Sequence, residues 1–562
     1  MIDARRLLRT RPLACALALR LGNAALVQTY VHPDETWQSL EVAHRLAFGY
    51  GYTTWEWRHA LRGFAHPMLF AAAYRAVGML GLDGTFLVVS NTRRRLEVTC
   101  EIAAVAAPYI LVAAIAAAVD YATLRLARRV AGDDVAWWAL LCSAVSWSMG
   151  SGVMRPLVNS AETALTAIAL VYWPWRRPAR AGRLPDARGS LLTALCFAAL
   201  SCIVRPTSAA LWLCAGLVLL ANQPRSGCVS RSIRIVGAAA AVGAVAVAAM
   251  AAVDRVGYGR WVFPPYQFYL FNVHEGLATW FGESPPLYHA YVSMPILFAA
   301  MLPFVVHGVY TAYRTQSVTC EPAAVALGAA VLFSLAGHME YRFLYPLLPI
   351  GHMYAAVSIA SLAGPLLPPP AVAQPPKPPK RPRWSARRVV LYLLLTSLPP
   401  ALYLNLVHQR GVVDVMAHLR RGAQAGAVTS IGFLMPCHST PYYSHLHADI
   451  PMWFLSCEPP LARSDRASHY WEADDFEQHP ADFVREIFAP PAEGEHPPAS
   501  RHRRRRQRRA RPSHLVLYDG MVRRIDRQLA ALGYEESARF FNTHFSGDTR
   551  RAGDVVVYSA KH

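Results

Sequence analysis

Charged side chains are scarce in this chain. Lys, Arg, Asp and Glu together make up 16% of its 562 residues, whereas hydrophobic residues make up 54%. Soluble domains carry about 25% charged residues, and their apolar segments are rarely long enough to cross a bilayer. The composition therefore excludes an ordinary soluble protein and predicts a polytopic α-helical membrane protein.

Several common binding motifs are also missing. The sequence contains no CxxC pair, no P-loop pattern and no GxGxxG pattern. Zinc sites, nucleotide phosphates and dinucleotide cofactors therefore have no positive support in the sequence. We expect no cofactor and assign no metal ligands, and we leave open whether the activity depends on a metal ion.

The ten cysteines show no metal-binding spacing. Eight of them lie in or near apolar runs, where Cys behaves as a small hydrophobic residue. Cys437 and Cys457 lie in the more polar C-terminal part. They can form a disulfide only in an oxidising compartment and at short distance, so the sequence leaves both states open.

Eleven apolar runs approach the ~20 residues that cross a hydrocarbon core. They lie at about 12–31, 99–119, 135–153, 158–175, 189–204, 207–222, 234–253, 290–311, 322–337, 343–363 and 389–406. Four arginines precede the first run, as in a signal peptide, but no obvious small-residue cleavage site follows it. We therefore expect a retained anchor and about eleven transmembrane helices.

The net charge of +20 could indicate a nucleic-acid partner, but the basic residues gather in alternate loops. If the N-terminus is cytosolic, the cytosolic loops are 125–129, 176–188, 225–234, the loop at Arg314 and 377–388. All are basic, as the positive-inside rule requires. The same alternation places the candidate site residues together on the opposite face, and we expect no nucleic-acid partner.

We expect two domains. Residues 1–406 form the polytopic catalytic domain, with an acidic loop at 32–66 on the non-cytosolic side and a proline-rich cytosolic linker at 364–388. Residues 407–562 form a small α+β domain on the non-cytosolic side. Its apolar runs at 515–518 and 555–558 predict strands, 521–532 predicts a helix, and 493–511 predicts a disordered basic insertion.

The sequence His32-Pro33-Asp34-Glu35 places two carboxylates directly after the first apolar run. Neighbouring side chains point in different directions, so one acid can face a substrate while the other braces the site. A partly desolvated carboxylate gains basicity, which suits removal of a proton from a hydroxyl group. The alternatives are a polar helix cap at the lipid surface and a metal site formed by His32, Asp34 and Glu35.

Cations follow on later segments of the same side. Snorkelling to water is the stronger interpretation for Arg155 and Arg205. His338, Glu340 and Arg342 lie within five residues at the start of an apolar run. The planar donor fork of Arg suits a phosphate, so we expect this group to converge on one.

Aromatic residues near the ends of the runs predict an interfacial belt, and some of them can stack on sugars. They are Trp37, Trp55, Trp57, Trp261 and Tyr266. Taken with the polar segments, the weaker candidates for substrate binding are His32, Gln38, Glu41, Trp55, Glu56, Arg205, Asp254, Arg255, Tyr258 and Glu340.

Four segments carry a family resemblance. His32-Pro-Asp-Glu, Gln38-Ser-Leu-Glu-Val-Ala-His44, Phe48-Gly-Tyr-Gly-Tyr-x-Thr-Trp-Glu56 and His338-x-Glu-x-Arg342-Phe-x-Tyr345-Pro346 resemble the dolichyl-phosphate-mannose-dependent mannosyltransferases of the GT-C class. C-terminal segments at 434–445, 468–470, 472–474, 541–544 and 556–558 resemble the branch that acts on glycosylphosphatidylinositol (GPI) precursors. The resemblance covers nearly the whole chain.

This resemblance implies a multi-pass enzyme of the endoplasmic reticulum (ER) membrane with a lumenal site. It would transfer mannose from dolichyl phosphate mannose to a GPI precursor that bears two mannoses, forming an α1,2 bond. The donor is β-linked, so transfer inverts the anomeric carbon and needs one base, which the family motif places at Asp34 with Glu35 in support. Arg342 and His338 would stabilise the departing phosphate.

Two features depart from the family pattern: Met339 replaces the usual Lys, and the basic insertion is additional. A sister enzyme that acts on dolichol-linked oligosaccharide shares the acidic motif and remains an alternative. The non-enzyme alternative is a transporter, which would show repeated hydropathy and charges near the membrane midplane. The sequence shows no such repeat.

Overall fold

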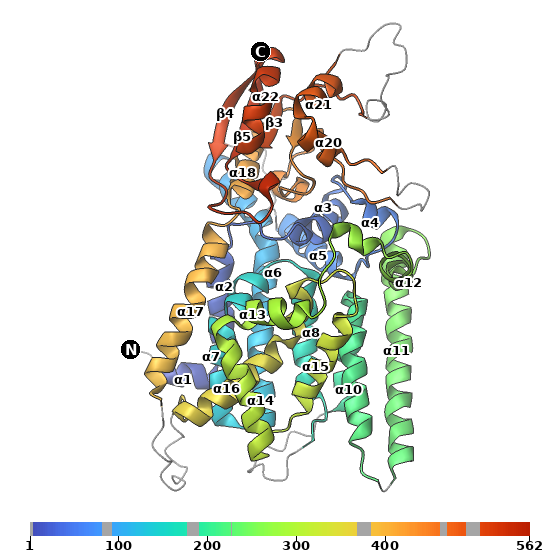
Figure 1. The fold of residues 1–562 in the computed structure, drawn as a ribbon, viewed down its shortest axis with the longest axis vertical. Helices are drawn as coiled ribbons and strands as arrows, with labels where there is room; N and C mark the ends of the chain where they lie inside the picture. The colour runs from blue at the N-terminus through green and yellow to red at the C-terminus, as the bar shows by residue number, and fades with distance from the viewer. Residues whose placement is uncertain are drawn as a thin grey trace. The chain divides into compact units, whose positions relative to one another are not determined.

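The computed structural model describes residues 4–80, 93–176, 190–225, 227–367, 384–460, 469–489 and 506–561 (Figure 1). The chain divides into two compact units. The first contains Met1–Val27 and His59–Leu402, and the second contains Gln28–Arg58 and Tyr403–His562. The acidic segment near the N-terminus and the C-terminal region therefore share one unit, although about 350 residues of the first unit separate them in the sequence.

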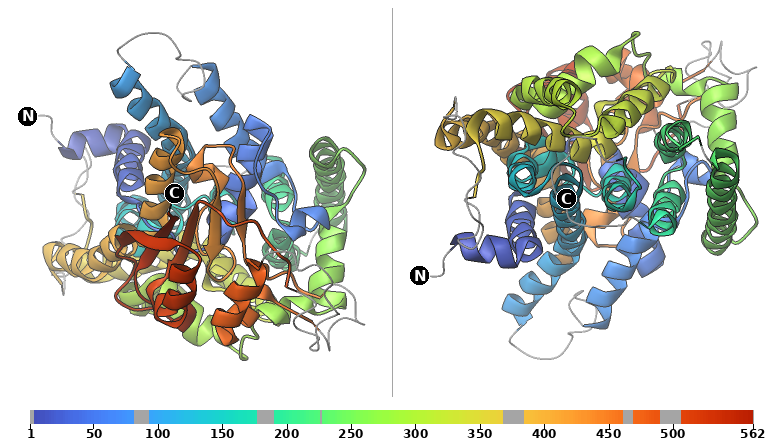
Figure 2. Two further views of the ribbon diagram at one scale, coloured as in Figure 1. Left: turned by 90° about the horizontal axis from the view of Figure 1, so that it is seen from above. Right: turned by 90° about the horizontal axis from the view of Figure 1, so that it is seen from below.

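The described part of the first unit is helical, and many of its helices are seen nearly end-on in Figure 2. The α-helices are α1 (Ala4–Thr10), α2 (Pro12–Leu26), α5 (Ala65–Met79), α6 (Arg93–Ala131), α7 (Asp133–Val145), α8 (Val158–Tyr172), α9 (Leu191–Val204), α10 (Ala209–Ala221), α11 (Cys228–Tyr258), α12 (Pro264–Tyr269), α13 (Met294–Phe298), α14 (Leu302–Thr315), α15 (Glu321–Phe333), α16 (Leu348–Ala363) and most of α17 (Ala386–Leu406). Short 3₁₀ or π turns connect several of them, among them η3 (Pro206–Ser208) and η8 (Tyr341–Leu347).

A helix occurs in each of the eleven predicted apolar runs, which confirms a helical membrane protein. Among the described residues, five stretches are long and apolar enough to cross a bilayer: Val105–Ala131, Cys228–Tyr258, His289–Thr315, Tyr341–Ala363 and Ala386–Gln424. Four shorter apolar helices accompany them. The count of eleven crossings stays a prediction. Helix α5 is an apolar helix that the sequence analysis did not anticipate.

Small residues and a buried ion pair hold the helices of this unit together. Gly308 on α14 lies so close to the Tyr354 carbonyl of α16 that a Cβ atom would collide with it. On α2, the fully buried Arg20 donates from Nε and Nη2 to Asp120 of α6 at 2.7 and 2.8 Å. Ser143 of α7 donates to the same carboxylate at 2.6 Å. A charged pair is tolerated in such a place because each partner satisfies the other.

The second unit is built on a mixed five-stranded sheet of order β2-β1-β3-β5-β4. Its strands are β1 (Ile431–Leu434), β2 (Met452–Phe454), β3 (His514–Tyr518), β4 (Tyr534–Phe540) and β5 (Val555–Ala560). The β1 strand pairs in parallel with β2 and β3, whereas β5 pairs antiparallel with β3 and β4. The two strands and the helix predicted from the sequence are confirmed as β3, β5 and α22 (Asp519–Ala531).

Alternation along the strands gives the sheet two buried faces. On one face, Val516 and Val557 pack with Val415 and Met416 of α18 (Gly411–Gln424) and with Trp37 of the acidic segment. On the other face lie helices α20 (Glu472–Gln478), α21 (Pro480–Ile487) and α22. The acidic segment is therefore part of the hydrophobic core of this unit.

Cys437 and Cys457 form a disulfide in this unit, with their Cα atoms 6.0 Å apart. The insertion predicted at 493–511 and the linker predicted at 364–388 lie largely outside the described residues. Within the described end of the insertion, Arg506 donates to Asp475 at 2.6 Å and Arg509 to Glu472 at 2.7 Å. Residues 506–511 thus depart from the disorder expected there, because two arginines pair with acids of α20.

Candidate functional site

The acidic motif opens a helix. Helical backbone begins at Asp34, passes through a π turn, η1 (Thr36–Leu40), and continues as α3 (Glu41–Phe48). The Pro33 carbonyl accepts from the Trp37 amide at 3.0 Å, which fixes the first turn. Gly49 ends the helix with φ of 84°, a left-handed conformation that glycine adopts without strain. Wide π turns of this kind are frequent at functional sites.

The two adjacent acids have different surroundings. The Glu35 side chain is 1% exposed, and its Oε1 accepts from the backbone amides of Val31 at 2.8 Å and His32 at 3.3 Å. It therefore holds the turn that leads into the helix. Asp34 is half-buried, and its charge acts on Tyr30 and His438. One acid braces the loop, while the other remains partly accessible.

The helix that follows the acids is attached to the C-terminal part of its unit. Trp37 donates from Nε1 to the Thr440 carbonyl at 2.9 Å, and its ring lies 4.3 Å from the ring of His438. Glu41 is fully buried and accepts from the Tyr442 amide at 3.0 Å and from the Ser444 hydroxyl at 2.6 Å. The sequence predicts that Glu41 binds substrate, whereas in the structure its carboxylate binds a turn about 400 residues away.

Burial dominates the electrostatics of this segment. It raises the pKa of Glu41 to about 7, although the hydrogen bonds from Ser444 and Tyr442 oppose the shift. Burial also lowers the pKa of His44 to about 4 and that of His438 to about 4, with Asp34 opposing the shift of His438. At neutral pH these imidazoles are therefore uncharged and place no cation beside Asp34.

Most of the other candidate residues in the second unit point into the protein. Gln38 donates to Glu56 at 3.5 Å, which joins η1 to α4 (Trp55–Arg58). Trp55 and Trp57 are only 6% and 4% exposed. Their burial makes packing, rather than an interfacial belt, their main contribution here.

The predicted cation group lies in the first unit, at the start of η8. Arg342 donates from Nε and Nη2 to both oxygens of Glu340, at 2.6 and 2.5 Å. The Nε2 atom of His338 lies 3.5 Å from the same carboxylate, and its Nδ1 lies 2.8 Å from the Gly282 carbonyl. The hydrogen bond to Glu340 raises the pKa of His338, against the effect of burial. The sequence cluster is thus a spatial cluster, with Glu340 at its centre.

Helix α8 adds two residues, Asn159 and Glu162, that were not among the candidates from the sequence. Asn159 donates to the Arg342 carbonyl at 3.2 Å, and Glu162 accepts from Arg205 at 3.0 Å. Arg205 also lies over the Phe343 ring, 4.7 Å from its centroid. Asn159 and Glu162 lie three residues apart on one apolar helix, so the sequence alone could have indicated that these two polar side chains share a face.

Snorkelling is the wrong interpretation for Arg155 and Arg205. Arg155 is 1% exposed, and its charge acts on Tyr341 and Tyr345 beside Arg342. A guanidinium that reaches water cannot be buried to this degree, and Arg205 pairs with the buried Glu162. Both arginines instead belong to the surroundings of the η8 cation group.

The remaining candidates lie at the end of α11. Asp254 is 1% exposed and accepts from the Phe64 amide at 2.8 Å, and Tyr258 donates to the Arg62 carbonyl at 2.7 Å. Both side chains therefore hold the segment before α5. Arg255, between them, is exposed.

Cys437, His438 and Cys457 form the one close group of three possible metal-binding side chains found among the described residues. Because their two sulfur atoms form the disulfide, they do not present two free thiolates to a metal ion. The alternative ligand set of His32, Asp34 and Glu35 does not meet as such a group in the described residues.

The solved structure of ArnT from Cupriavidus metallidurans bound to undecaprenyl phosphate has the same fold class. It aligns over 97% of this chain and 96% of its own, with a TM-score of 0.55 and 12% sequence identity. The fold is therefore that of the GT-C glycosyltransferases.

The chain belongs to the Alg9-like mannosyltransferase family, which matches residues 12–447. GPI mannosyltransferase 3 of Yarrowia lipolytica is 39% identical over 96% of this chain and 95% of its own length. GPI alpha-1,2-mannosyltransferase 3 of Homo sapiens is 33% identical over 97% of this chain and 86% of its own length. The protein is thus a glycosyltransferase, and the transporter alternative is removed.

Proposed function

We propose that this enzyme adds the third mannose to the GPI precursor, taking it from dolichyl phosphate mannose and forming an α1,2 bond. The observation that carries the proposal is the similarity to GPI mannosyltransferases 3 along almost the entire chain, C-terminal unit included. The acidic helix start and the cation group supply the chemical groups that such a transfer needs. The enzyme would act in the ER membrane, with its site on the lumenal face.

Asp34 acts as the general base in this proposal. It removes the proton from the acceptor's 2-hydroxyl as that oxygen attacks the anomeric carbon of the donor mannose. The bond from that carbon to the phosphate oxygen breaks, and its electron pair leaves with dolichyl phosphate. The configuration inverts in one displacement, so one carboxylate suffices. Glu35 supports it by holding the turn from Val31 to His32.

Arg342 and His338 stabilise the phosphate that departs. A phosphate ester is a good leaving group, so cations can replace a strong general acid. Glu340 holds the Arg342 guanidinium in one plane through two hydrogen bonds, and this pairing keeps the fork oriented. The hydrogen bond from Glu340 also favours the protonated form of His338, as the role of a cation requires.

The proposed topology follows the basic loops. The N-terminus and the proline-rich linker at 364–388 face the cytosol, about eleven segments cross the membrane, and the acidic loop and residues 407–562 face the lumen. An oxidising lumen is consistent with the Cys437–Cys457 disulfide. The partners are then dolichyl phosphate mannose, the GPI precursor and the lipids of that membrane.

Complementation tests this assignment. Cells that lack the third GPI mannosylation accumulate the two-mannose intermediate, and expression of this chain should convert it to the three-mannose form. Expression of Asp34→Asn should leave it unconverted, whereas Asp482→Asn, at an exposed side chain of α21, should behave like the parent. Correction of a truncated dolichol-linked oligosaccharide, with the GPI intermediate unchanged, would assign the chain to the sister activity.

A further inference from the structure

We propose that the C-terminal turn 437–444 positions the base Asp34 through two positioning residues, Trp37 and Glu41. This turn is here called the clamp turn. The inference rests on the proposed function, because it assumes that Asp34 takes the acceptor proton. It assigns Glu41 a role in orienting the acid instead of contacting the substrate.

The helical geometry connects the three residues. Asp34, Trp37 and Glu41 follow one another at intervals of three and four residues along one helical stretch. The stretch passes through the π turn η1, so α-helical spacing does not set the side on which each residue lies. Because the backbone is continuously helical from Asp34 to Glu41, contacts that fix Trp37 and Glu41 also fix the helix start on which Asp34 lies.

Trp37 is the first attachment point. Its ring is 2% exposed and packs against His438, Tyr442 and Phe454, with centroid distances of 4.3, 5.1 and 5.0 Å. Its Nε1 atom donates to the Thr440 carbonyl at 2.9 Å. The hydrogen bond is directional, so it restricts the movement of the indole ring more than packing alone would.

Glu41 is the second attachment point. Its carboxylate accepts from the Tyr442 amide, the Ser444 amide and the Ser444 hydroxyl, at 3.0, 3.1 and 2.6 Å. These three donors, which come from Tyr442 and Ser444, converge on the carboxylate and form a small anion-binding nest. Ser444 also meets Nδ1 of His445 at 3.0 Å, which fixes the orientation of its hydroxyl group.

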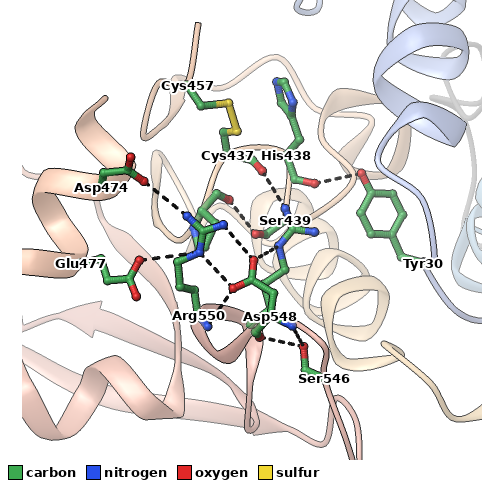
Figure 3. Close-up of polar contacts among 12 residues, drawn as sticks. Tyr30, Cys437, His438, Ser439, Cys457, Asp474, Glu477, Ser546, Asp548 and Arg550 are labelled. Atoms are coloured by element: carbon green, nitrogen blue, oxygen red, sulfur yellow. Dashed lines mark hydrogen bonds and ion pairs between the residues drawn. A yellow bond between two sulfur atoms is a disulfide. The ribbon is translucent and has the colours of Figure 1, made fainter. Parts of the chain in front are cut away.

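Several contacts and a disulfide hold the first residues of the clamp turn (Figure 3). The disulfide to Cys457 anchors Cys437, whose carbonyl accepts from Arg551 at 3.5 Å. His438 has φ of +58°, a conformation rare for a side chain of this size, and presents its carbonyl to the Tyr30 hydroxyl at 3.1 Å. Ser439 donates to the Pro436 carbonyl at 2.6 Å.

The clamp turn contacts the acidic segment through Tyr30, Trp37 and Glu41. The turn supplies a fixed surface, and the segment Gln28–Arg58 takes its position from it. Displacement of a reacting group by about 1 Å can cost ~10²-fold in rate. The clamp turn should therefore affect the chemical step more than substrate binding.

Purified full-length enzyme with dolichyl phosphate mannose and a two-mannose GPI acceptor provides the test. We expect Glu41→Leu to lower kcat by ~10²-fold with little change in KM for the donor. Glu41→Gln, which keeps an acceptor oxygen and the same shape, should restore most of the loss. Ser444→Ala should lower kcat too, and its effect should not add to that of Glu41→Leu, because both remove one contact.

The pH profile separates positioning from folding. Loss of folded enzyme lowers the whole rate profile without moving it, whereas a displaced Asp34 should shift its acidic limb. If Glu41→Leu does not accumulate, Trp37→Phe keeps an aromatic ring at the position and removes the hydrogen bond to Thr440 together with part of the indole packing surface. The double variant Cys437→Ser, Cys457→Ser should reproduce the same shift, more weakly.

Two outcomes would overturn the clamp. One is an unmoved profile with unchanged kcat in Glu41→Leu and Trp37→Phe, and the other is additive effects of Glu41→Leu and Ser444→Ala. Failure of the parent enzyme to mannosylate the GPI acceptor would instead overturn the proposed function. Asp482→Asn, on α21 in an exposed pair with Arg485, serves as the matched control in each series.

Discussion

The acidic segment and the η8 cation group are held in opposite ways. Glu41, just beyond the acids, is bound by Tyr442 and Ser444, about 400 residues away in the sequence. The Arg342 side chain donates two hydrogen bonds to Glu340, two residues away, and the Arg342 backbone carbonyl accepts from Asn159. The position of the proposed base therefore depends on long-range contacts, whereas the side-chain pairing of Arg342 with Glu340 is local.

Mutations in the two regions should therefore have different effects on the reaction. Changes in the C-terminal unit should reach the acid, because that unit holds the acidic segment in its core. Changes near η8 should affect the leaving group and leave the acid in place.

Asp34→Asn should abolish transfer. Loss of a general base typically costs ~10²–10⁴ in rate, and Asn retains the shape and a hydrogen-bonding oxygen. Radiolabelled mannose transfer by purified enzyme measures the loss, while donor binding should persist. An Asn variant that turned over like the parent would show that another group takes the proton.

Arg342→Lys should slow transfer by ~10-fold or more, because hydrogen bonds to charged groups contribute about 1.5–3 kcal/mol each. Lys keeps the charge but cannot offer the planar fork that Glu340 now orients. Steady-state kinetics should show the loss in kcat rather than in KM for the acceptor. An equal rate in the Lys variant would mean that charge alone suffices at this position.

Glu41 makes the stability of the enzyme depend on pH. Burial raises its pKa from 4.5 to about 7, so the folded state binds a proton more strongly than the unfolded state does. This contribution is fully present below pH 4.5 and is lost as the pH rises through 7. Glu41→Gln should therefore be more stable than the parent at pH 8, as measured by thermal unfolding, and should flatten the decline between these values.

Asn159→Ala removes one hydrogen bond to the Arg342 backbone and should cost about 1 kcal/mol, or roughly fivefold in rate. This variant should lower the transfer rate as Arg342→Lys does, but by less. The acidic limb of its pH–rate profile should not shift. Thr163→Ala, on the same helix, is a suitable comparison. A shift of the acidic limb in Asn159→Ala would break the separation between the two regions.

Arg58→Ala should have the smallest effect. Arg58 and Glu458 join the acidic segment to the C-terminal region, but both side chains are about half exposed. Exposed ion pairs contribute about 0–1 kcal/mol. Unfolding and transfer should stay close to the parent, and a large loss would show that surface charge, rather than buried contacts, holds the segment.

Local patterns predicted much of this molecule. Hydropathy located a helix in each apolar run, and alternation located β3 and β5, because both signals reside in neighbouring residues. The grouping of His338, Glu340 and Arg342 could also be predicted, because these residues lie close together in the sequence. The attachment of Glu41 to Ser444, the burial of Arg155 and the Cys437–Cys457 disulfide were not, since each depends on segments that only the folded chain brings together.

Product analysis of a single turnover tests the central claim most directly. Purified enzyme in lipid nanodiscs is mixed with labelled dolichyl phosphate mannose and a two-mannose GPI acceptor, and the product is treated with an α1,2-specific mannosidase. The account predicts one added mannose that the mannosidase releases, with no product from Asp34→Asn. A mannose in another linkage, transfer from a sugar nucleotide, or equal product from Asp34→Asn would contradict it.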